Sequence, residues 1–178
     1  KIYSMWRNKA VSDTYEPGSV FKVFVAAAAL EEGLVTPDYC FSCSGSIRVA
    51  DNVLHCHKTS GHGNQTLAEG LMNSCNPFFV TIGQKLGTEN FYKYFEAFGF
   101  TDETLVDLPG EATPVKDVTY HSLENMGISQ VSSSSFGQTF QVSAIQMITG
   151  VSAIANGGNL MQPYIVGAML DEDGNTVF

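Results

Sequence analysis

The sequence lacks long hydrophobic runs and is poor in charged residues. Its longest uninterrupted apolar stretch is Val23–Leu30, whereas a membrane-spanning helix needs about 20 apolar residues. Charged residues make up 15% of the chain, against about 25% in an average soluble domain. The chain opens on Lys1 without a leader-like pattern and ends on Phe178 without a helix cap or polar tail. We therefore expect no transmembrane segment within these residues, and we expect them to be a piece of a longer protein.

Basic residues are scarce as well. The chain has 9 basic and 18 acidic residues, giving a net charge of −9. Nucleic acids and anionic membranes bind positively charged protein surfaces, so neither is expected as a partner. Hydrophobic residues make up 44% and aromatic residues 11%, which argues against intrinsic disorder. The 178 residues suffice for one domain, residues 1–178, that hides roughly 70% of its unfolded surface.

Local signals predict an α-rich chain of about five helices. Pro17 and Gly18 favour a turn, and the residues after them would form a helix that is apolar on nearly every face. A buried helix is therefore expected from Ser19 to Leu30. Capping residues in front and small or glycine residues behind predict further helices. These are Thr66–Asn73, Asn76–Gly87, Thr88–Phe98 and Ser143–Ala155.

Little sheet is expected. Ile47–Val49 and Val53–His55 are predicted to pair as a short hairpin across Asp51-Asn52. A strand is predicted at Tyr164–Met169, followed by a turn at Asp173-Gly174. Residues 34–65 otherwise look irregular, residues 100–141 are predicted to be loops and short turns, and 132–135 a polar loop.

Ser19 and Lys22 form a Ser-x-x-Lys pattern at a predicted helix start. Residues three apart share one helix face, so the lysine nitrogen can reach the serine hydroxyl. A serine hydroxyl needs a base to act as a nucleophile, and a buried lysine can lose its proton near neutral pH. The motif alone is weak, because the serine also suits a plain helix cap and the lysine a solvated surface.

Ser74-Cys75-Asn76 forms a Ser-x-Asn pattern at a break between two predicted helices. A second hydroxyl there can shuttle a proton, and an amide can hold a lysine or a substrate carbonyl. The bland alternative is that Asn76 only caps the helix that begins at Pro77.

In combination these motifs resemble the penicillin-binding proteins, the D,D-transpeptidases of cell-wall synthesis. The extended form around Ser19 and the Ser-Cys-Asn are similar to the monofunctional class B enzymes, and to the division and sporulation branch more than to class A. The matching stretches follow the family's order over about residues 6–166. They are Tyr15–Lys22, Gly61–Gly63, Asn73–Phe79, Phe136–Gln138, Gln146-Met147, Ala155–Gly158 and Pro163.

The resemblance implies the α+β fold shared by penicillin-binding proteins and serine β-lactamases. It implies that Ser19 is the acylated nucleophile and Lys22 its general base. Ser74 would relay the proton, and Asn76 would contact the amide side of the substrate. It also implies peptidoglycan stem peptides, β-lactams and other cell-wall synthesis proteins as partners, without a cofactor.

One departure from the family is large. Its third motif, Lys-Thr-Gly on a sheet strand, is absent, and the nearest match, Lys58-Thr59-Ser60, precedes Ser74 instead of following it. The resemblance therefore predicts a helix-rich fragment without most of its central sheet, and with weak or no activity of its own. The sheet-facing surface left bare predicts homodimerisation.

The cysteines and histidines leave alternatives open. Zinc would suit the donor types of Cys40, Cys43, Cys56 and the histidines around them. Their spacing fits no standard zinc knuckle, however, so we expect no metal here. The resemblance implies a location outside the cytoplasm, on a membrane anchor in front of these residues, where a Cys43–Cys56 disulfide is favoured. Free thiols are the third alternative. Cys75 is expected to be a packed thiol, and His62 a loop residue.

Two other functions remain as alternatives. A β-lactam sensor or class D β-lactamase also uses Ser-x-x-Lys, although such proteins usually carry Val where Asn76 stands. A non-catalytic metal-binding or redox module organised by the Cys/His cluster is the other.

Overall fold

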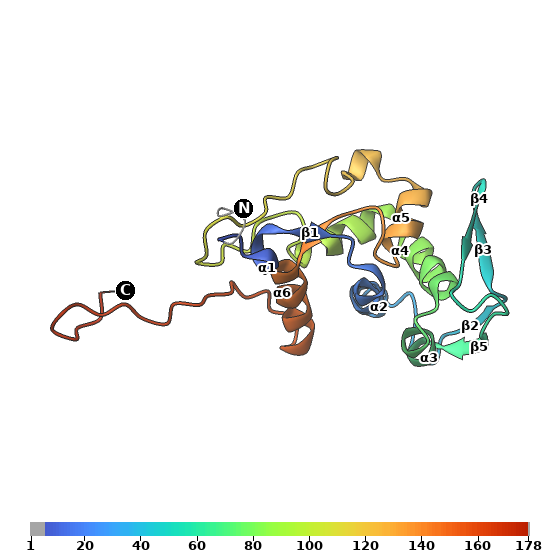
Figure 1. The fold of residues 1–178 in the computed structure, drawn as a ribbon. Coiled ribbons are helices and arrows are strands. Elements are labelled where there is room, and N and C mark those ends of the chain that lie inside the picture. Colours follow the sequence, from blue (N-terminus) through green and yellow to red (C-terminus); the bar gives the residue numbers. More distant parts are fainter. Residues whose placement is uncertain (1–5, 178) are drawn as a thin grey trace.

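The computed structural model describes residues 6–177, which contain six α-helices and three two-stranded antiparallel sheets. Figure 1 shows their arrangement. The helical elements are α1 (Lys9–Ser12), η2 (Gly18–Phe21), α2 (Lys22–Glu31), α3 (Leu67–Met72), α4 (Asn76–Ala97), η3 (Leu123–Asn125), α5 (Ile128–Ser134) and α6 (Ala144–Ala155). The strands are β1 (Thr14–Tyr15), β2 (Cys40–Cys43), β3 (Ser46–Val49), β4 (Asn52–His55), β5 (Gly63–Thr66) and β6 (Val142–Ser143). Among the described residues, no helix is both long and apolar enough to span a bilayer. The α-rich fold class is thus confirmed.

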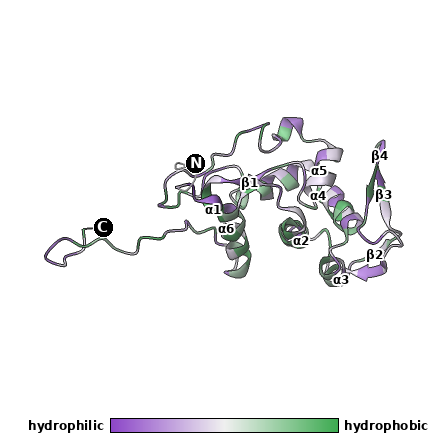
Figure 2. Ribbon diagram, in the orientation of Figure 1, coloured by the Kyte–Doolittle hydropathy of each residue, from purple (hydrophilic) through white to green (hydrophobic). Residues whose placement is uncertain are grey.

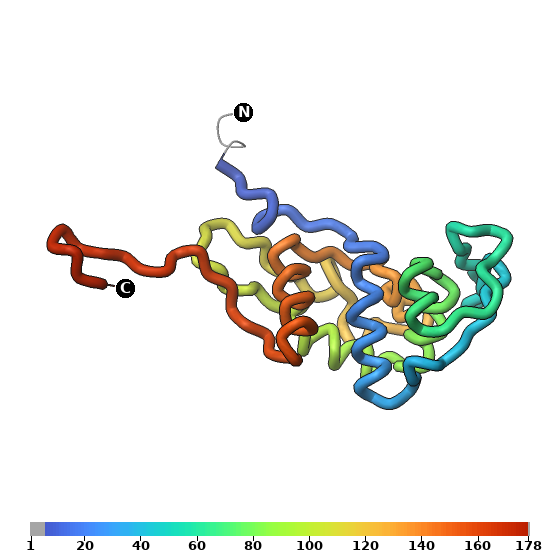
Figure 3. Tube along the Cα trace, turned by 90° about the horizontal axis from the view of Figure 1, so that it is seen from below, coloured from blue at the N-terminus to red at the C-terminus, as the bar shows by residue number. Residues whose placement is uncertain are grey.

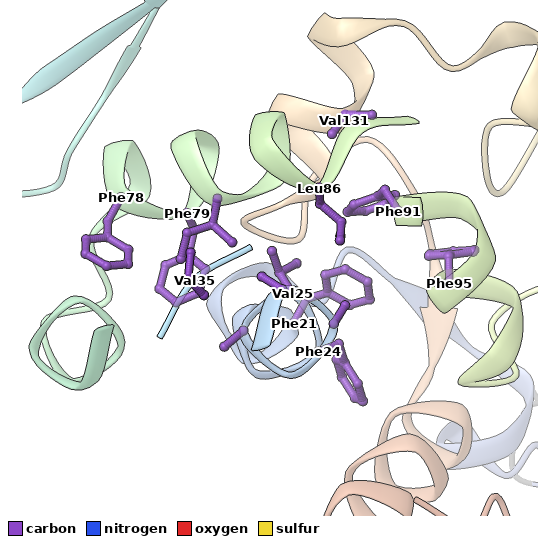
Figure 4. Packing of buried hydrophobic residues seen from close by; sticks show 14 of the residues in the cluster. Phe21, Phe24, Val25, Val35, Phe78, Phe79, Leu86, Phe91, Phe95 and Val131 are labelled. Atoms are coloured by element: carbon purple, nitrogen blue, oxygen red, sulfur yellow. The ribbon is translucent and has the colours of Figure 1, made fainter. Parts of the chain in front are cut away.

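Helix α2 lies at the centre of the molecule, between α4 and α6 (Figure 3). Hydrophobic residues are concentrated in α2 and α6 (Figure 2), and α2 is buried on nearly all sides, as its sequence predicts. Figure 4 shows Phe21 near Phe91 and Phe95 of α4, with ring centroids 6.2 and 6.0 Å apart. Phe24 points away from these two rings and packs against Phe98 and Phe100. Phe21 also meets Phe140 edge-on, with ring centroids 4.7 Å apart. This aromatic core anchors the segment on which Ser-x-x-Lys lies.

The predicted helix boundaries hold where local chemistry sets them. Thr66 and Ser143 both form capping boxes, with the Thr66 N–H donating to Glu69 at 2.8 Å and the Ser143 N–H to Gln146 at 2.9 Å. The predicted break at Gly87 is a kink inside α4, where this glycine has φ 74°. Only glycine adopts such a backbone angle without strain, so the helix must change direction there.

The predicted hairpin is present as β3 and β4, with Ile47 opposite Leu54. Its turn falls at Ala50-Asp51, one residue earlier than predicted, because Asn52 already pairs with Val49. Strand β2 pairs with β5 around the base of this hairpin. That second pair joins residues 40–43 to residues 63–66, although the sequence predicts irregular structure at 34–65 apart from the hairpin.

The prediction of a polar loop at residues 132–135 is wrong. Residues 128–134 form α5, and Ser132, Ser134 and Ser135 are buried. The cause is a close approach to α4, since a Cβ added to Gly83 would lie 1.7 Å from the Ser135 Oγ. Small side chains allow the two helices to pack in contact. The buried Ser135 hydroxyl has a hydrogen-bond partner, because it donates to the Val131 carbonyl at 2.6 Å.

The strand predicted at Tyr164–Met169 is also wrong. This segment is exposed and leads away from the body of the molecule (Figure 1). The N–H groups of Ile165 and Val166 donate to the Asp107 carboxylate instead of to the backbone of a neighbouring strand. This largely apolar segment therefore has no partner strand among residues 6–177. The turn at Asp173-Gly174 is confirmed, with the Gly174 N–H donating to the Asp171 carbonyl.

Candidate active site

Lys22 gathers the predicted site residues around one nitrogen atom. Its side chain is completely buried at the start of α2. The Nζ lies 3.0 Å from Ser19 Oγ, 2.9 Å from Ser74 Oγ, 2.8 Å from the Ser74 carbonyl and 2.7 Å from Asn76 Oδ1. The structure therefore brings together all four residues that the two sequence motifs supply.

Ser19 presents its hydroxyl at the surface while its partner is buried. It lies on η2, the single 3₁₀ turn that leads into α2, so Lys22 follows it on the same helical face. The residue is exposed, whereas the lysine nitrogen lies beneath it. A substrate can therefore reach the oxygen from outside while the amine contacts it from inside.

Ser74 and Asn76 lie at the sharp corner between α3 and α4. Ser74 has φ 48°, a left-handed conformation that costs a non-glycine residue about 1–3 kcal/mol and is often found at functional sites. Asn76 was predicted to cap α4, but the cap residue is Cys75, and Asn76 is the first helical residue. Its amide is thus free to accept from Lys22 and to donate to the His55 carbonyl at 3.2 Å.

Burial governs the protonation of the lysine. Loss of solvent lowers the pKa of Lys22 to about 8, although the sulfurs of Cys75 and Cys56 act in the opposite direction. With that pKa, about a tenth of the amine is neutral at pH 7 and about half at pH 8. An unperturbed lysine, with a pKa near 10.4, would be almost entirely charged. Lys22 can therefore act as a base near neutrality.

The contacts also fix where the lone pair of a neutral amine points. The Ser74 carbonyl and Asn76 Oδ1 are acceptors only, and they take the two N–H groups that a neutral amine retains. The lone pair is then left to the hydroxyls of Ser19 and Ser74, which can donate. Deprotonation of Lys22 thus creates an acceptor directed at a serine hydroxyl.

The stretch around Gly137 supports the nucleophile from the other side. The Gly18 N–H donates to the Gly137 carbonyl at 2.9 Å, and the Thr139 N–H to the Glu16 carboxylate at 2.9 Å. A Cβ at Gly137 would lie 2.0 Å from the Gly18 carbonyl oxygen. The family resemblance includes Phe136–Gln138. The packing of Gly137 against Gly18, however, is a long-range contact that the sequence does not predict.

The cysteines fall into two groups. Cys40 is exposed, whereas Cys43, Cys56 and Cys75 are buried thiols that converge with His62 behind the site. Burial raises the pKa of Cys75 to about 12, so this thiol is not a nucleophile near neutral pH. The pairing of Cys43 with Cys56 stays a prediction.

Comparisons with known proteins agree with this geometry. Residues 1–177 match the family described as the penicillin binding protein transpeptidase domain. The chain is 44% identical over 167 residues to stage V sporulation protein D of Bacillus subtilis, covering 93% of this chain and 25% of that protein. It is 31% identical over 171 residues to penicillin-binding protein PbpB of Mycolicibacterium smegmatis, covering 94% of this chain and 25% of that protein.

Solved structures show the same similarity. Penicillin binding protein 3 of Mycobacterium tuberculosis, complexed with aztreonam, matches with a TM-score of 0.86 and 31% identity over 96% of this chain and 37% of that one. The chain thus spans about a quarter of the length of these curated relatives. The match over nearly the whole chain disfavours both a Cys/His module and a β-lactamase-like sensor as its main function. The chain therefore belongs to the penicillin-binding protein transpeptidase family, in agreement with the class B resemblance of its motifs.

Proposed function

We propose that the protein carrying this chain cross-links peptidoglycan by serine acyl transfer, as a D,D-transpeptidase. The observation that carries the proposal is the buried Lys22 amine, with its pKa lowered to about 8, lying 3.0 Å from the exposed Ser19 hydroxyl. That pairing supplies what a serine nucleophile needs, a base with a pKa near the working pH.

The proposed acylation step uses the contacts already described. The Ser19 oxygen attacks the carbonyl carbon of the penultimate D-Ala in a stem peptide, and its proton passes to the neutral Lys22 amine. Ser74, which touches the same nitrogen, relays a proton to the departing nitrogen of the terminal D-Ala. The C–N bond breaks, free D-Ala leaves, and an ester to Ser19 remains.

Deacylation runs the same relay in reverse. An amine of a second stem peptide attacks the ester carbonyl, gives up a proton through Ser74 or Lys22, and forms the new amide as the Ser19 oxygen leaves and is reprotonated. The Asn76 side-chain oxygen accepts a hydrogen bond from Lys22. The same side chain would contact the amide of the bound substrate. A β-lactam would acylate Ser19 in the same manner and stall at the ester.

The chain contains no Lys-Thr-Gly sequence after Ser74. In the family, that strand supplies carboxylate recognition and part of the oxyanion hole. Loss of one oxyanion donor alone costs on the order of 10²–10³ in rate. We therefore expect this chain alone to be acylated weakly or not at all, and the longer protein to be active.

The relatives indicate the setting in which this activity would operate. Their names describe sporulation and penicillin-binding proteins, and one solved neighbour is a complex with ampicillin. We infer that the catalytic domain works at the outer face of a bacterial cytoplasmic membrane, on an anchor outside these residues, alongside other cell-wall synthesis proteins. β-Lactams of both the monobactam and penicillin types would be ligands.

The test is covalent labelling with a fluorescent penicillin, read by intact mass. It is run on this chain and on a chain extended through a Lys-Thr-Gly motif, each with a Ser19→Ala control. An adduct that Ser19→Ala abolishes supports the proposal. A properly folded extended chain that acquires no adduct, or a Ser19→Ala variant labelled as fast as the parent, overturns it.

A further inference from the structure

Four potential metal ligands from four separate places in the chain converge behind the active site. Cys43 ends β2, Cys56 follows β4, His62 precedes β5 and Cys75 caps α4. The ligand atoms of all four lie within 4.8 Å of one another. The Cys56 Sγ lies 3.5 Å from the His62 Nδ1. Bond lengths of about 2.3 Å to sulfur and 2.0–2.1 Å to nitrogen give a tetrahedral zinc site an S–N edge of about 3.5 Å.

We propose that Cys43, Cys56, Cys75 and His62 bind one Zn²⁺ ion as a closed Cys₃His site. The donor set decides the metal, because three soft thiolates and one imidazole at the corners of a tetrahedron suit Zn²⁺ better than the hard cations that prefer oxygen. Four protein ligands leave no open position, so the ion has a structural role. The zinc reading of the sequence paired Cys43 with Cys40 and did not include Cys75.

Burial favours a metal over three free thiols. Cys43, Cys56 and Cys75 are 3%, 2% and 0% exposed. A disulfide would join two of these three sulfurs and leave the third, together with His62, without a bond. One ion would engage all four groups. Cys40, which completes the Cys-x-x-Cys pattern, is exposed and lies outside the cluster.

The backbone around Cys43 is shaped for a thiolate. The Gly45 N–H donates to its Sγ at 3.4 Å. A backbone N–H directed at the sulfur favours the charged thiolate over the neutral thiol. Gly61 lets the loop close over this end of β2, since a Cβ there would lie 2.2 Å from the Cys43 carbonyl oxygen.

Cys75 shows why an ion would matter. Its thiol is 0% exposed, and an uncompensated thiolate would be costly in such surroundings. A bound divalent cation reverses that preference, because it is the largest local charge and deprotonates a coordinating thiol outright. Binding would release the thiol protons of all three cysteines to solvent and would be tighter at higher pH.

The ion would also fix the catalytic corner. Cys75 is the residue between Ser74 and Asn76, both of which contact Lys22. Anchoring its sulfur to β2 and to the loop before β5 would hold the left-handed Ser74 in place. This consequence for catalysis rests on the proposed function, whereas zinc binding itself does not.

Metal content is the first test. The chain is purified under reducing conditions, incubated with ZnCl₂, desalted and analysed for zinc by mass spectrometry. We expect about one zinc per chain, retained in Cys40→Ser and in Ser19→Ala, and lost in Cys43→Ser and in Cys75→Ser. Because Ser19→Ala removes the proposed nucleophile but not a ligand, the two proposals fail separately.

Cobalt substitution of the unmutated chain guards against variants that do not fold. Co²⁺ bound by three thiolates should give the intense visible absorption of a tetrahedral thiolate site, and Zn²⁺ should bleach it. A folded, reduced chain that binds neither metal overturns the proposal. A disulfide among Cys43, Cys56 and Cys75 would also overturn it, if the chain binds no zinc after that disulfide is reduced. Such a disulfide would make the chain isolated without reductant lighter by two hydrogen atoms.

The positioning role has its own readout. Removing zinc by chelation from the extended, penicillin-reactive chain should slow acylation about tenfold or more, because a displaced catalytic group is costly. Re-adding Zn²⁺ should restore the rate, and Cys40→Ser should behave like the parent. Acylation that is unchanged after verified loss of zinc would overturn this role.

Discussion

The lowered pKa of Lys22 makes a quantitative prediction about the pH dependence of acylation. If the neutral amine is the base, the rate follows the fraction of Lys22 that has lost its proton. With a pKa of about 8, that fraction is about 0.1 at pH 7, 0.5 at pH 8 and 0.9 at pH 9. The rate should therefore rise about fivefold from pH 7 to 8, less than twofold from pH 8 to 9, and then level off.

The shape of the profile, more than its direction, tests the burial argument. A lysine with an ordinary pKa near 10.4 would also give a rate that rises with pH, but about tenfold per unit throughout this range. The two cases differ by about tenfold in the ratio of rates at pH 9 and pH 7. Lowering of the pKa by burial is thus visible as a plateau.

The assay is the second-order rate constant for labelling by a fluorescent penicillin, measured from pH 6 to 10 on a chain extended through a Lys-Thr-Gly motif. Lys22→Arg is the control, because arginine stays protonated and cannot act as a base. It should lower the rate by about 10²–10⁴ and remove the inflection near pH 8. A flat profile in the parent, or a rise that continues past pH 9 without levelling, would refute the reasoning.

The same pKa affects stability, with a sign that follows from proton binding. Between the folded pKa of about 8 and the unfolded value near 10.5, the unfolded chain binds more protons at Lys22 than the folded chain does. The contribution of this residue to stability therefore rises with pH through that window. At pH 7 its burial therefore opposes folding, and the fold retains this base at a cost in stability.

Three further outcomes follow from the site and its surroundings. Asn76→Asp should raise the pKa of Lys22, since the nitrogen lies 2.7 Å from Oδ1, and should move the rise in acylation rate to higher pH; an unmoved profile would show that this contact does not tune the base. Gly137→Ala should lower the free energy of unfolding by about 2–5 kcal/mol in urea titration, because its Cβ would meet the Gly18 carbonyl at 2.0 Å and its φ is +82°. Gly157→Ala, with φ +88° but open space around it, should cost only about 1–2 kcal/mol, and equal losses would contradict the clash. Light scattering should show this chain dimerising at high concentration through surface that the missing strands would cover, and a clean monomer would count against that.

Helix starts and the catalytic motifs could be predicted because their signals are local. Thr66 with Glu69 and Ser143 with Gln146 form capping boxes that predict where two helices begin. Helical spacing alone brings Ser19 and Lys22 together. Family resemblance added the roles of Ser74 and Asn76, which no periodicity could supply.

The missed features all depend on contacts between distant segments. Helix α5 looked like a loop because serine disfavours helix interiors, yet Gly83, far away in the sequence, makes small residues necessary there. The place of Cys75 beside Cys43 follows from the pairing of β2 with β5 and from the corner between α3 and α4. Spacing along the chain pointed instead to Cys40.

The catalytic nitrogen has consequences for how the folding of this protein can be followed. Its partners come from residues 19, 74 and 76, and the glycine that braces the nucleophile is residue 137. These segments meet only when α2, α4 and the chain beyond α5 are docked together, so a partly folded chain has no lowered lysine pKa and no activated serine. Reaction with a penicillin would therefore count native molecules one by one. In the extended protein, the labelled fraction during a urea titration would report global unfolding as a covalent, countable mark.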